Sequence, residues 1–250
     1  MTEHNVLYIV EGETEKNLLR RLWERFDPGN NYDVYVYNTN IHVLIESLFQ
    51  DGRMDEDLEI VRELRSKERD EEKRNILRKK FEYVYMIFDF DPQDSRINLK
   101  RIGQLLDYFN DPGSNGRLYL NYPMVESFRH FRSLDDAEFK DRRVNLEVLK
   151  RGEYKRIVDF ESSNELKQLN NYTKETFGSI IKMHLQKENY ILNGLFEMMD
   201  EEIFLNLTGS ELLERQIQSM EEDDSVYVIN TCIFTVVEYM PSVFFGKSAS

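Results

Sequence analysis

The sequence predicts an α/β fold in which a mainly parallel sheet is flanked by helices. Short apolar runs alternate with amphipathic helical patterns over the first half of the chain. A stretch rich in charges of both signs interrupts this alternation at about residues 51–82, and strand-like runs fade after residue 128. We therefore expect an α/β domain over residues 1–128 with a charged helical insertion at about 51–82, and a C-terminal helical lobe over residues 129–250.

Two strand and helix pairs open the predicted domain. Val6–Val10 is short, β-branched and followed by Glu11-Gly12, which is typical of a buried parallel strand that ends in a turn. Apolar residues then recur at helical spacing up to Pro28-Gly29, which predicts the first helix. Residues 32–37 alternate like a second strand, and residues 41–49 predict the next helix.

Two more strands complete the predicted sheet. Residues 83–88 form a third strand-like run that leads directly into Asp89-Phe90-Asp91. Residues 98–109 predict a helix, and residues 118–122 predict the fourth strand. The charged insertion between the second and third strands carries a sparse apolar stripe, which indicates a solvated helical excursion.

The C-terminal half shows helical patterns and no clear strand. The segments expected to be helical are residues 146–160, 173–192, 212–220 and 226–239. The chain after residue 157 is strongly acidic. This acidic lobe is where we expect assembly or a partner protein to act.

The charge distribution limits where a polyanion can bind. The net charge is −14, which argues against broad nonspecific coating of nucleic acid. Between residues 129 and 156 basic residues outnumber acids, whereas the chain after residue 157 is acidic. The candidate substrate-binding residues are Arg129, Arg132, Lys140, Arg142 and Arg143. A solvated helix face is the alternative interpretation of the same charges.

Other sequence features indicate a cytoplasmic protein without a membrane segment. Cys232 is the only cysteine, so no intramolecular disulfide can form. The first 15 residues lack the basic and apolar segments of a secretory signal. The most hydrophobic stretch, residues 226–245, contains Asn230 and Glu238, which a buried helix tolerates better than a membrane span.

Acidic residues follow two of the predicted strands. Glu11 and Glu15 follow the first strand, whereas Asp89, Asp91 and Asp94 follow the third. In a parallel sheet the carboxyl ends of the strands meet at one edge, where ligands bind. Carboxylates at close range raise one another's pKa unless a cation neutralises them, and their hard oxygen atoms suit Mg²⁺ or Mn²⁺. The sequence therefore predicts a divalent metal site.

At these positions the chain resembles the Toprim family. Glu11-Gly12-x-Thr14-Glu15 after the first strand and Asp89-x-Asp91 after the third are similar to the Toprim pattern. That family includes topoisomerases, primases and metal-dependent nucleases. Its glutamate acts as general acid/base or metal ligand, and its two aspartates hold Mg²⁺. The resemblance implies these roles for Glu11, Asp89 and Asp91.

A third segment narrows the resemblance. Residues 121–128, which begin Asn121-Tyr122-Pro123 and contain Glu126, are similar to the Asn-Pro-x-x-Glu element of Toprim nucleases of anti-phage defence. These include the overcoming-lysogenization-defect nucleases and small Toprim proteins linked to restriction systems. Here Tyr122 separates the asparagine from the proline.

The same resemblance adds three metal-ligand candidates. Glu126 is the first of them, and Glu15 and Asp94 rank below it. Glu15 is equally explained as a helix first-turn acid, and Asp94 as a helix cap.

The resemblance implies an Mg²⁺- or Mn²⁺-dependent nuclease that hydrolyses phosphodiester bonds of RNA, including tRNA, or of DNA, as an anti-phage effector. Asp89 and Asp91 would hold the metal, and Glu11 would move a proton or hold a second metal. The alternative is a non-catalytic Toprim-fold sensor or binding subunit of a defence complex.

Partner proteins are also expected from the resemblance. Gly246-Lys247-Ser248 imitates the end of a phosphate-binding loop, but Pro241 stands where the first glycine is needed. No ATPase site is therefore predicted in this chain. Since many related nucleases work with an ATPase, we expect an ATPase partner in trans and an oligomer or complex.

Overall fold

A five-stranded sheet forms the centre of the molecule. The computed structural model describes residues 5–29, 31–50 and 52–246. The strand order is β2-β1-β5-β7-β6, and all neighbours run parallel except β6 and β7. The strands are β1 (Val6–Val10), β2 (Tyr32–Val36), β5 (Tyr83–Asp89), β6 (Asn110–Asp111) and β7 (Gly116–Asn121). The predicted α/β class with a mainly parallel sheet is therefore confirmed.

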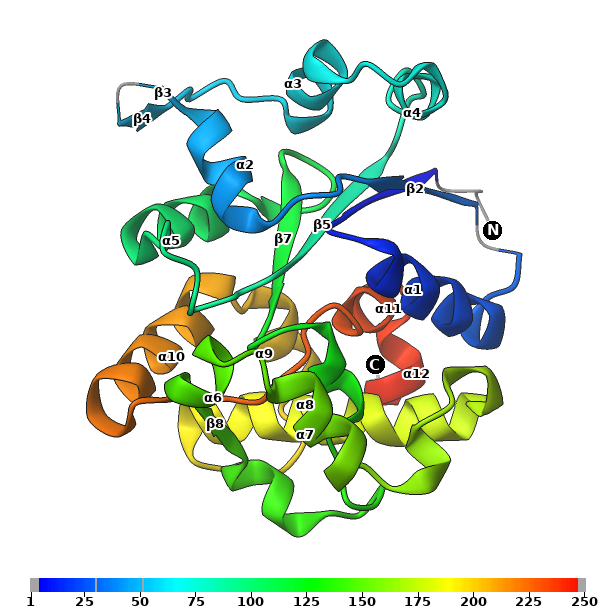
Figure 1. Ribbon diagram of the computed structural model, residues 1–250. Helices are drawn as coiled ribbons and strands as arrows, with labels where there is room; N and C mark the ends of the chain where they lie inside the picture. The colour runs from blue at the N-terminus through cyan, green and yellow to red at the C-terminus, as the bar shows by residue number, and fades with distance from the viewer. Residues whose placement is uncertain (1–4, 30, 51, 247–250) are drawn as a thin grey trace.

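Helices cover both faces of this sheet. Figure 1 shows α2 (Ile41–Leu48) and α5 (Leu99–Tyr108) on one side, and α1 (Glu13–Phe26) with α11 (Phe234–Tyr239) on the other. Every residue of β1 is fully buried between them, which explains why this strand is apolar throughout. The bounds of the strands and helices predicted for the first half agree with the observed bounds to within one or two residues.

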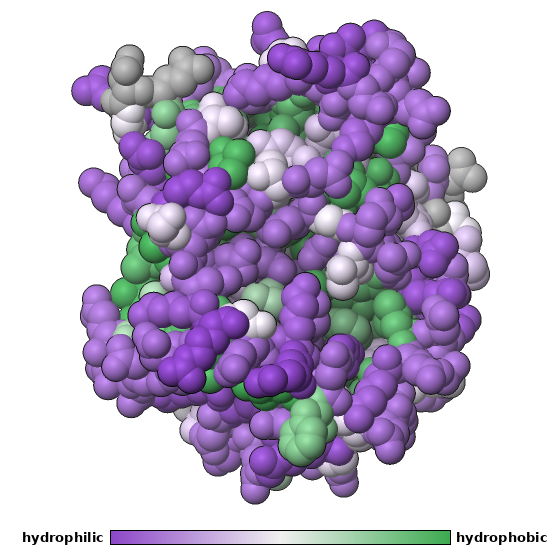
Figure 2. All heavy atoms as spheres, viewed as in Figure 1, coloured by the Kyte–Doolittle hydropathy of each residue, from purple (hydrophilic) through white to green (hydrophobic). Residues whose placement is uncertain are grey.

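The charged insertion begins with a small antiparallel hairpin, which the helical prediction missed. β3 (Phe49–Gln50) pairs with β4 (Arg53–Met54), and α3 (Ile60–Lys67) and α4 (Glu71–Ile76) follow. Only Ile60 and Leu64 of α3 are buried, and α4 buries no residue. Figure 2 shows mainly hydrophilic residues over this part of the molecule, as expected for a solvated excursion.

The C-terminal half is mainly helical. Its helices of eight or more residues are α7 (Tyr154–Glu161), α8 (Lys174–Asn193) and α10 (Gly209–Asp223). Shorter helical segments are η1 (Val125–Arg129), η2 (Ala137–Asp141), α6 (Leu146–Lys150), η3 (Asn164–Leu166), η4 (Leu169–Asn171), α9 (Glu201–Asn206), α11 and α12 (Pro241–Phe245). The predicted helix over residues 146–160 is divided into α6 and α7, because Gly152 adopts a left-handed backbone with φ 67°.

The predicted helix over residues 226–239 was wrong in its first half. β9 (Ser225–Tyr227) instead pairs with β8 (Arg143–Asn145), and Ile229 bridges to Tyr122. The β-branched Val226 and Val228 are fully buried in this extended segment. Asn230 then accepts a hydrogen bond from the Ile233 amide at 3.4 Å, so its side chain starts a turn before α11.

Residues 229–239 return to the sheet. The Thr231 hydroxyl donates to the Leu120 carbonyl at 2.8 Å, and the Cys232 amide donates to Asn121 Oδ1 at 3.2 Å. Further along, Tyr239 packs edge to face on Trp23 with ring centroids 5.2 Å apart. The buried apolar core is consequently continuous from β1 to α11.

Among the described residues, none of the helices combines the length and apolar character that crossing a bilayer requires. The segment that imitates a phosphate-binding loop ends in Lys247 and Ser248, which lie outside the described residues.

Candidate functional site

Three sheet strands end at the same edge and bring polar side chains together. Val10 of β1 is in register with Ile87 of β5, and Asp89 at the end of β5 is in register with Asn121 at the end of β7. Glu11 therefore follows β1 beside Asp89, and its Oε2 accepts a hydrogen bond from the Asp89 amide at 3.2 Å. The parallel topology thus explains why acids far apart in the sequence meet here.

The Asp89 carboxylate is buried and held in one orientation. Its side chain accepts a hydrogen bond from Asn121 Nδ2 at 3.2 Å, and only 8% of the residue is exposed. The amide of Cys232 in turn donates to Asn121 Oδ1, which determines which end of the Asn121 side chain faces Asp89. The returning C-terminal segment therefore contributes to the order of this site.

Asp91 lies in a tight loop just beyond β5. Its φ of 43° is in the left-handed region, which aspartate tolerates better than most residues. Its amide donates to the Pro123 carbonyl at 3.2 Å, and its own carbonyl lies 3.2 Å from His42 Nε2. The Asp91 carboxylate accepts from Gln93 Nε2 at 3.0 Å. These contacts hold a strained backbone beside Asp89.

Two glutamates complete the acidic cluster, which we define as Glu11, Glu15, Asp89, Asp91 and Glu126. Glu15 is 3% exposed, and its Oε2 accepts from the Gly12 amide at 2.9 Å in a capping box. Glu126 in η1 is 8% exposed, and its Oε2 is buried without a hydrogen-bond partner among the described residues.

Lys155 of α7 is the cation that meets this cluster. Its Nζ lies 2.9 Å from Glu126 Oε1. The hydrogen bond and the carboxylates of Glu126 and Asp89 raise the pKa of Lys155 against the opposing effect of burial. Asp94 is held differently, because it pairs with Arg96 at 2.6 Å and accepts from Asn40 at 2.9 Å. Those partners keep the pKa of Asp94 below its usual value.

Burial, and after it the repulsion between neighbouring carboxylates, raises the pKa values of the cluster. Burial, with repulsion from Asp91 and Glu15, raises the pKa of Glu11 from 4.5 to about 7. Burial and the neighbouring carboxylates also raise the pKa of Asp89 well above its usual value. Burial raises the pKa of Glu15 and of Asp91 as well. A bound divalent cation would relieve this repulsion.

The donor set fits a hard cation, although the side chains are turned to other partners. The cluster offers only carboxylate oxygens, and the unpartnered Glu126 Oε2 is one of them. Within the described residues, no three His, Cys, Asp or Glu side chains stand ready to hold a metal ion. Glu11, Glu15 and Asp91 accept hydrogen bonds from neighbouring N–H groups instead. A cation would bind by replacing these bonds.

The five candidate substrate-binding cations are all paired with acids of the same chain. The ion pairs are Arg129 with Asp159, Arg132 with Glu138, Lys140 with Asp141, Arg142 with Asp136, and Arg143 with Asp223. The Arg142 side chain is 8% exposed, and it also donates to the His130 carbonyl at 2.6 Å. Arg142 therefore supports the fold of the C-terminal half.

Sequence reasoning left Lys155 and Asn121 out of the site. Lys155 stands in the basic stretch, but nothing in its local pattern separates it from its neighbours. Asn121 belongs to the recognised Asn-x-Pro segment, which was the available signal for it.

No protein-family model matches the chain, and no curated protein or solved structure matches it either.

Proposed function

We propose that this protein is a Toprim-like nuclease that hydrolyses phosphodiester bonds with the help of Mg²⁺ or Mn²⁺. The observation that carries the proposal is the meeting of Glu11, Asp89 and Asp91 at the carboxyl ends of β1 and β5. The buried Glu15 and Glu126 add to the negative charge at this point. Repulsion within such a cluster lowers the stability of the fold unless a bound cation neutralises the carboxylates.

The residues of the cluster divide into binding and proton-transfer roles. Asp89 and Asp91 would hold the cation, with Glu126 as a further ligand. A divalent cation there supplies charge neutralisation for a scissile phosphate, which contributes several kcal/mol. Asn121 keeps the Asp89 carboxylate oriented through its 3.2 Å hydrogen bond.

Glu11 and Lys155 supply the remaining chemistry. A carboxyl group with a pKa of about 7 accepts and releases protons near neutral pH, so Glu11 suits general acid/base work. Lys155 is a cation within contact of the cluster and suits a phosphate group of the substrate. We further propose RNA, tRNA or DNA as substrate, an anti-phage role, and an ATPase or oligomeric partner in trans, all from the resemblance to Toprim nucleases.

The test is a cleavage assay on purified protein. Labelled total RNA, tRNA, single-stranded DNA and plasmid are incubated with Mg²⁺, Mn²⁺ or EDTA. We expect cleavage with metal only, and a loss of at least about a hundredfold in Asp89→Asn. Asp107→Asn, which changes an exposed acid of α5, is the matched control and should cleave normally.

Three outcomes separate the alternatives. Equal cleavage by Asp89→Asn and wild type would refute the proposed mechanism. Calorimetric binding of Mn²⁺ by a protein that cleaves none of these substrates would indicate a missing activator. Neither binding nor cleavage would favour the non-catalytic sensor subunit.

A further inference from the structure

A cavity lies at the opposite end of the parallel strands from the acidic cluster. It has a volume of about 700 Å³, which is in the range of ligand-binding pockets. Tyr83 lines it at the start of β5, whereas Asp89 lies at the end of the same strand. Six residue steps of extended chain separate the two by about 20 Å. The cavity is therefore distinct from the acidic cluster.

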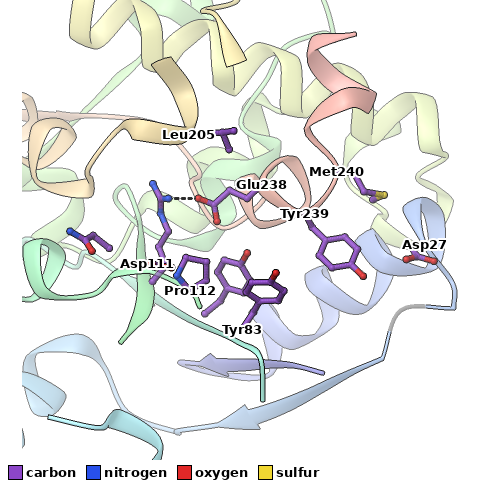
Figure 3. A pocket seen from close by; sticks show the side chains of 11 residues that line it. Asp27, Tyr83, Asp111, Pro112, Leu205, Glu238, Tyr239 and Met240 are labelled. Atoms are coloured by element: carbon purple, nitrogen blue, oxygen red, sulfur yellow. Dashed lines mark ion pairs between the residues drawn. The ribbon is translucent and has the colours of Figure 1, made fainter. Parts of the chain in front are cut away.

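Tyrosine rings form much of its wall. Tyr83, Tyr85 and Tyr239 line the cavity, and Figure 3 shows Tyr83 and Tyr239 near Glu238 around the same space. The Tyr85 ring stacks on Tyr8 at 5.4 Å, and Tyr239 packs on Trp23 at 5.2 Å. These contacts fix the rings in place, so the wall is formed before a ligand arrives. The faces of such rings attract cations.

The charges around the cavity are mostly negative. Asp27, Asp111 and Glu238 line it together with Arg117. Arg117 is already neutralised, because its Nη1 lies 2.5 Å from Glu238 Oε1 and its Nη2 donates to the Leu207 carbonyl at 2.7 Å. Among the described residues, neither Asp27 nor Asp111 forms an ion pair, so two negative charges remain uncompensated.

Glu238 adds a buried carboxylate to this wall. Its side chain is 6% exposed, and its Oε2 makes no hydrogen bond of ordinary geometry within the described part of the chain. Burial raises the pKa of Glu238 despite the opposing charge of Arg117, and Asp111 raises it further. Burial and the charge of Asp27 likewise raise the pKa of Tyr239. Burial is the larger cause of both shifts, and the charges of Asp111 and Asp27 add to it.

We propose that this cavity binds a small organic cation that carries an ammonium or guanidinium group. The tyrosine rings would contact the carbon skeleton and the charge, and Asp27 and Asp111 would pair with the cationic ends. Phosphates and other anions are repelled by the same carboxylates. The proposal is independent of the nuclease activity, because it uses none of the residues of the acidic cluster.

The cation has two sources with the same chemistry. It is either a free amine or guanidine metabolite, or the Lys or Arg side chain of a basic peptide. Free hexane-1,6-diamine and agmatine represent the first source, and a lysine-rich peptide represents the second. Hexane-1,6-diol matches the diamine in length without its charge.

Calorimetric titration of the full chain at low ionic strength tests the proposal, since salt screens exposed charges. We expect saturable binding of the diamine or agmatine, and none of the diol. Asp27→Asn and Asp111→Asn should each weaken binding about two- to fivefold, and Tyr239→Leu should weaken it by removing a ring. Glu214→Gln on α10, an exposed acid outside the cavity, should leave binding unchanged and controls for general attraction to an acidic chain.

The outcomes are distinguishable. Binding of the peptide alone, weakened by the same aspartate variants, would support the cation site and identify a protein side chain as its source. Binding that none of the cavity variants weakens would overturn the proposal, and so would cations that bind no better than the diol.

Discussion

Replacement of Glu11 by glutamine should stabilise the protein when no divalent cation is present. Burial and the charges of Asp91 and Glu15 raise the pKa of Glu11 from 4.5 to about 7. The stability linked to this group is fully present below pH 4.5 and is lost as the pH rises through 7. At about 1.36 kcal/mol per pH unit, the loss at pH 8 is at most about 3 kcal/mol.

The expected gain in the free energy of unfolding of Glu11→Gln follows from this upper limit on the loss in wild type. Glutamine has the shape of glutamate, and its oxygen can still accept from the Asp89 amide. Because neighbouring carboxylates share protons with Glu11, we expect Glu11→Gln to gain about 1–3 kcal/mol at pH 8.

Urea unfolding in EDTA at pH 8 and pH 4.5 measures this gain. The variant should exceed wild type at pH 8 and match it at pH 4.5, and Asp107→Asn should match wild type at both. Mn²⁺ should then stabilise wild type more than Glu11→Gln. A variant no more stable than wild type at pH 8 in EDTA would refute the electrostatic reasoning.

Two further predictions concern buried charges of the C-terminal half. Arg142→Met should lower the free energy of unfolding in urea by about 3–5 kcal/mol, because it leaves Asp136 buried without its partner. The control Lys140→Met breaks an exposed ion pair with Asp141 and should lower the free energy of unfolding by at most about 1 kcal/mol. Equal losses in the two variants would contradict the reasoning. Burial raises the pKa of Glu188 to about 8, so wild-type stability should fall from pH 4.5 to 8 and Glu188→Gln should flatten that fall in urea titrations. An equally steep fall in the variant would show that Glu188 does not cause it.

The fold of the first half could be predicted because its signals are local. Runs such as Val6–Val10 are apolar on both faces, and a turn signal such as Glu11-Gly12 follows directly. The meeting of Glu11 and Asp89 then follows from parallel pairing of two strands, which requires no knowledge of side-chain contacts.

The C-terminal half was harder to predict because its structure depends on distant contacts. Val226 is part of a strand because β8 pairs with it, although the apolar pattern of the segment also suits a helix. Lys155 meets Glu126 only after α7 packs beside η1, and no spacing in the sequence encodes that approach.

The central claim is that the acidic cluster binds a divalent cation, and calorimetric titration of Mn²⁺ at pH 8 tests it most directly. Wild type and Asp107→Asn should show saturable binding that competes with Mg²⁺, and Asp89→Asn should show none. No binding by wild type, or the same binding by Asp89→Asn, would contradict the claim.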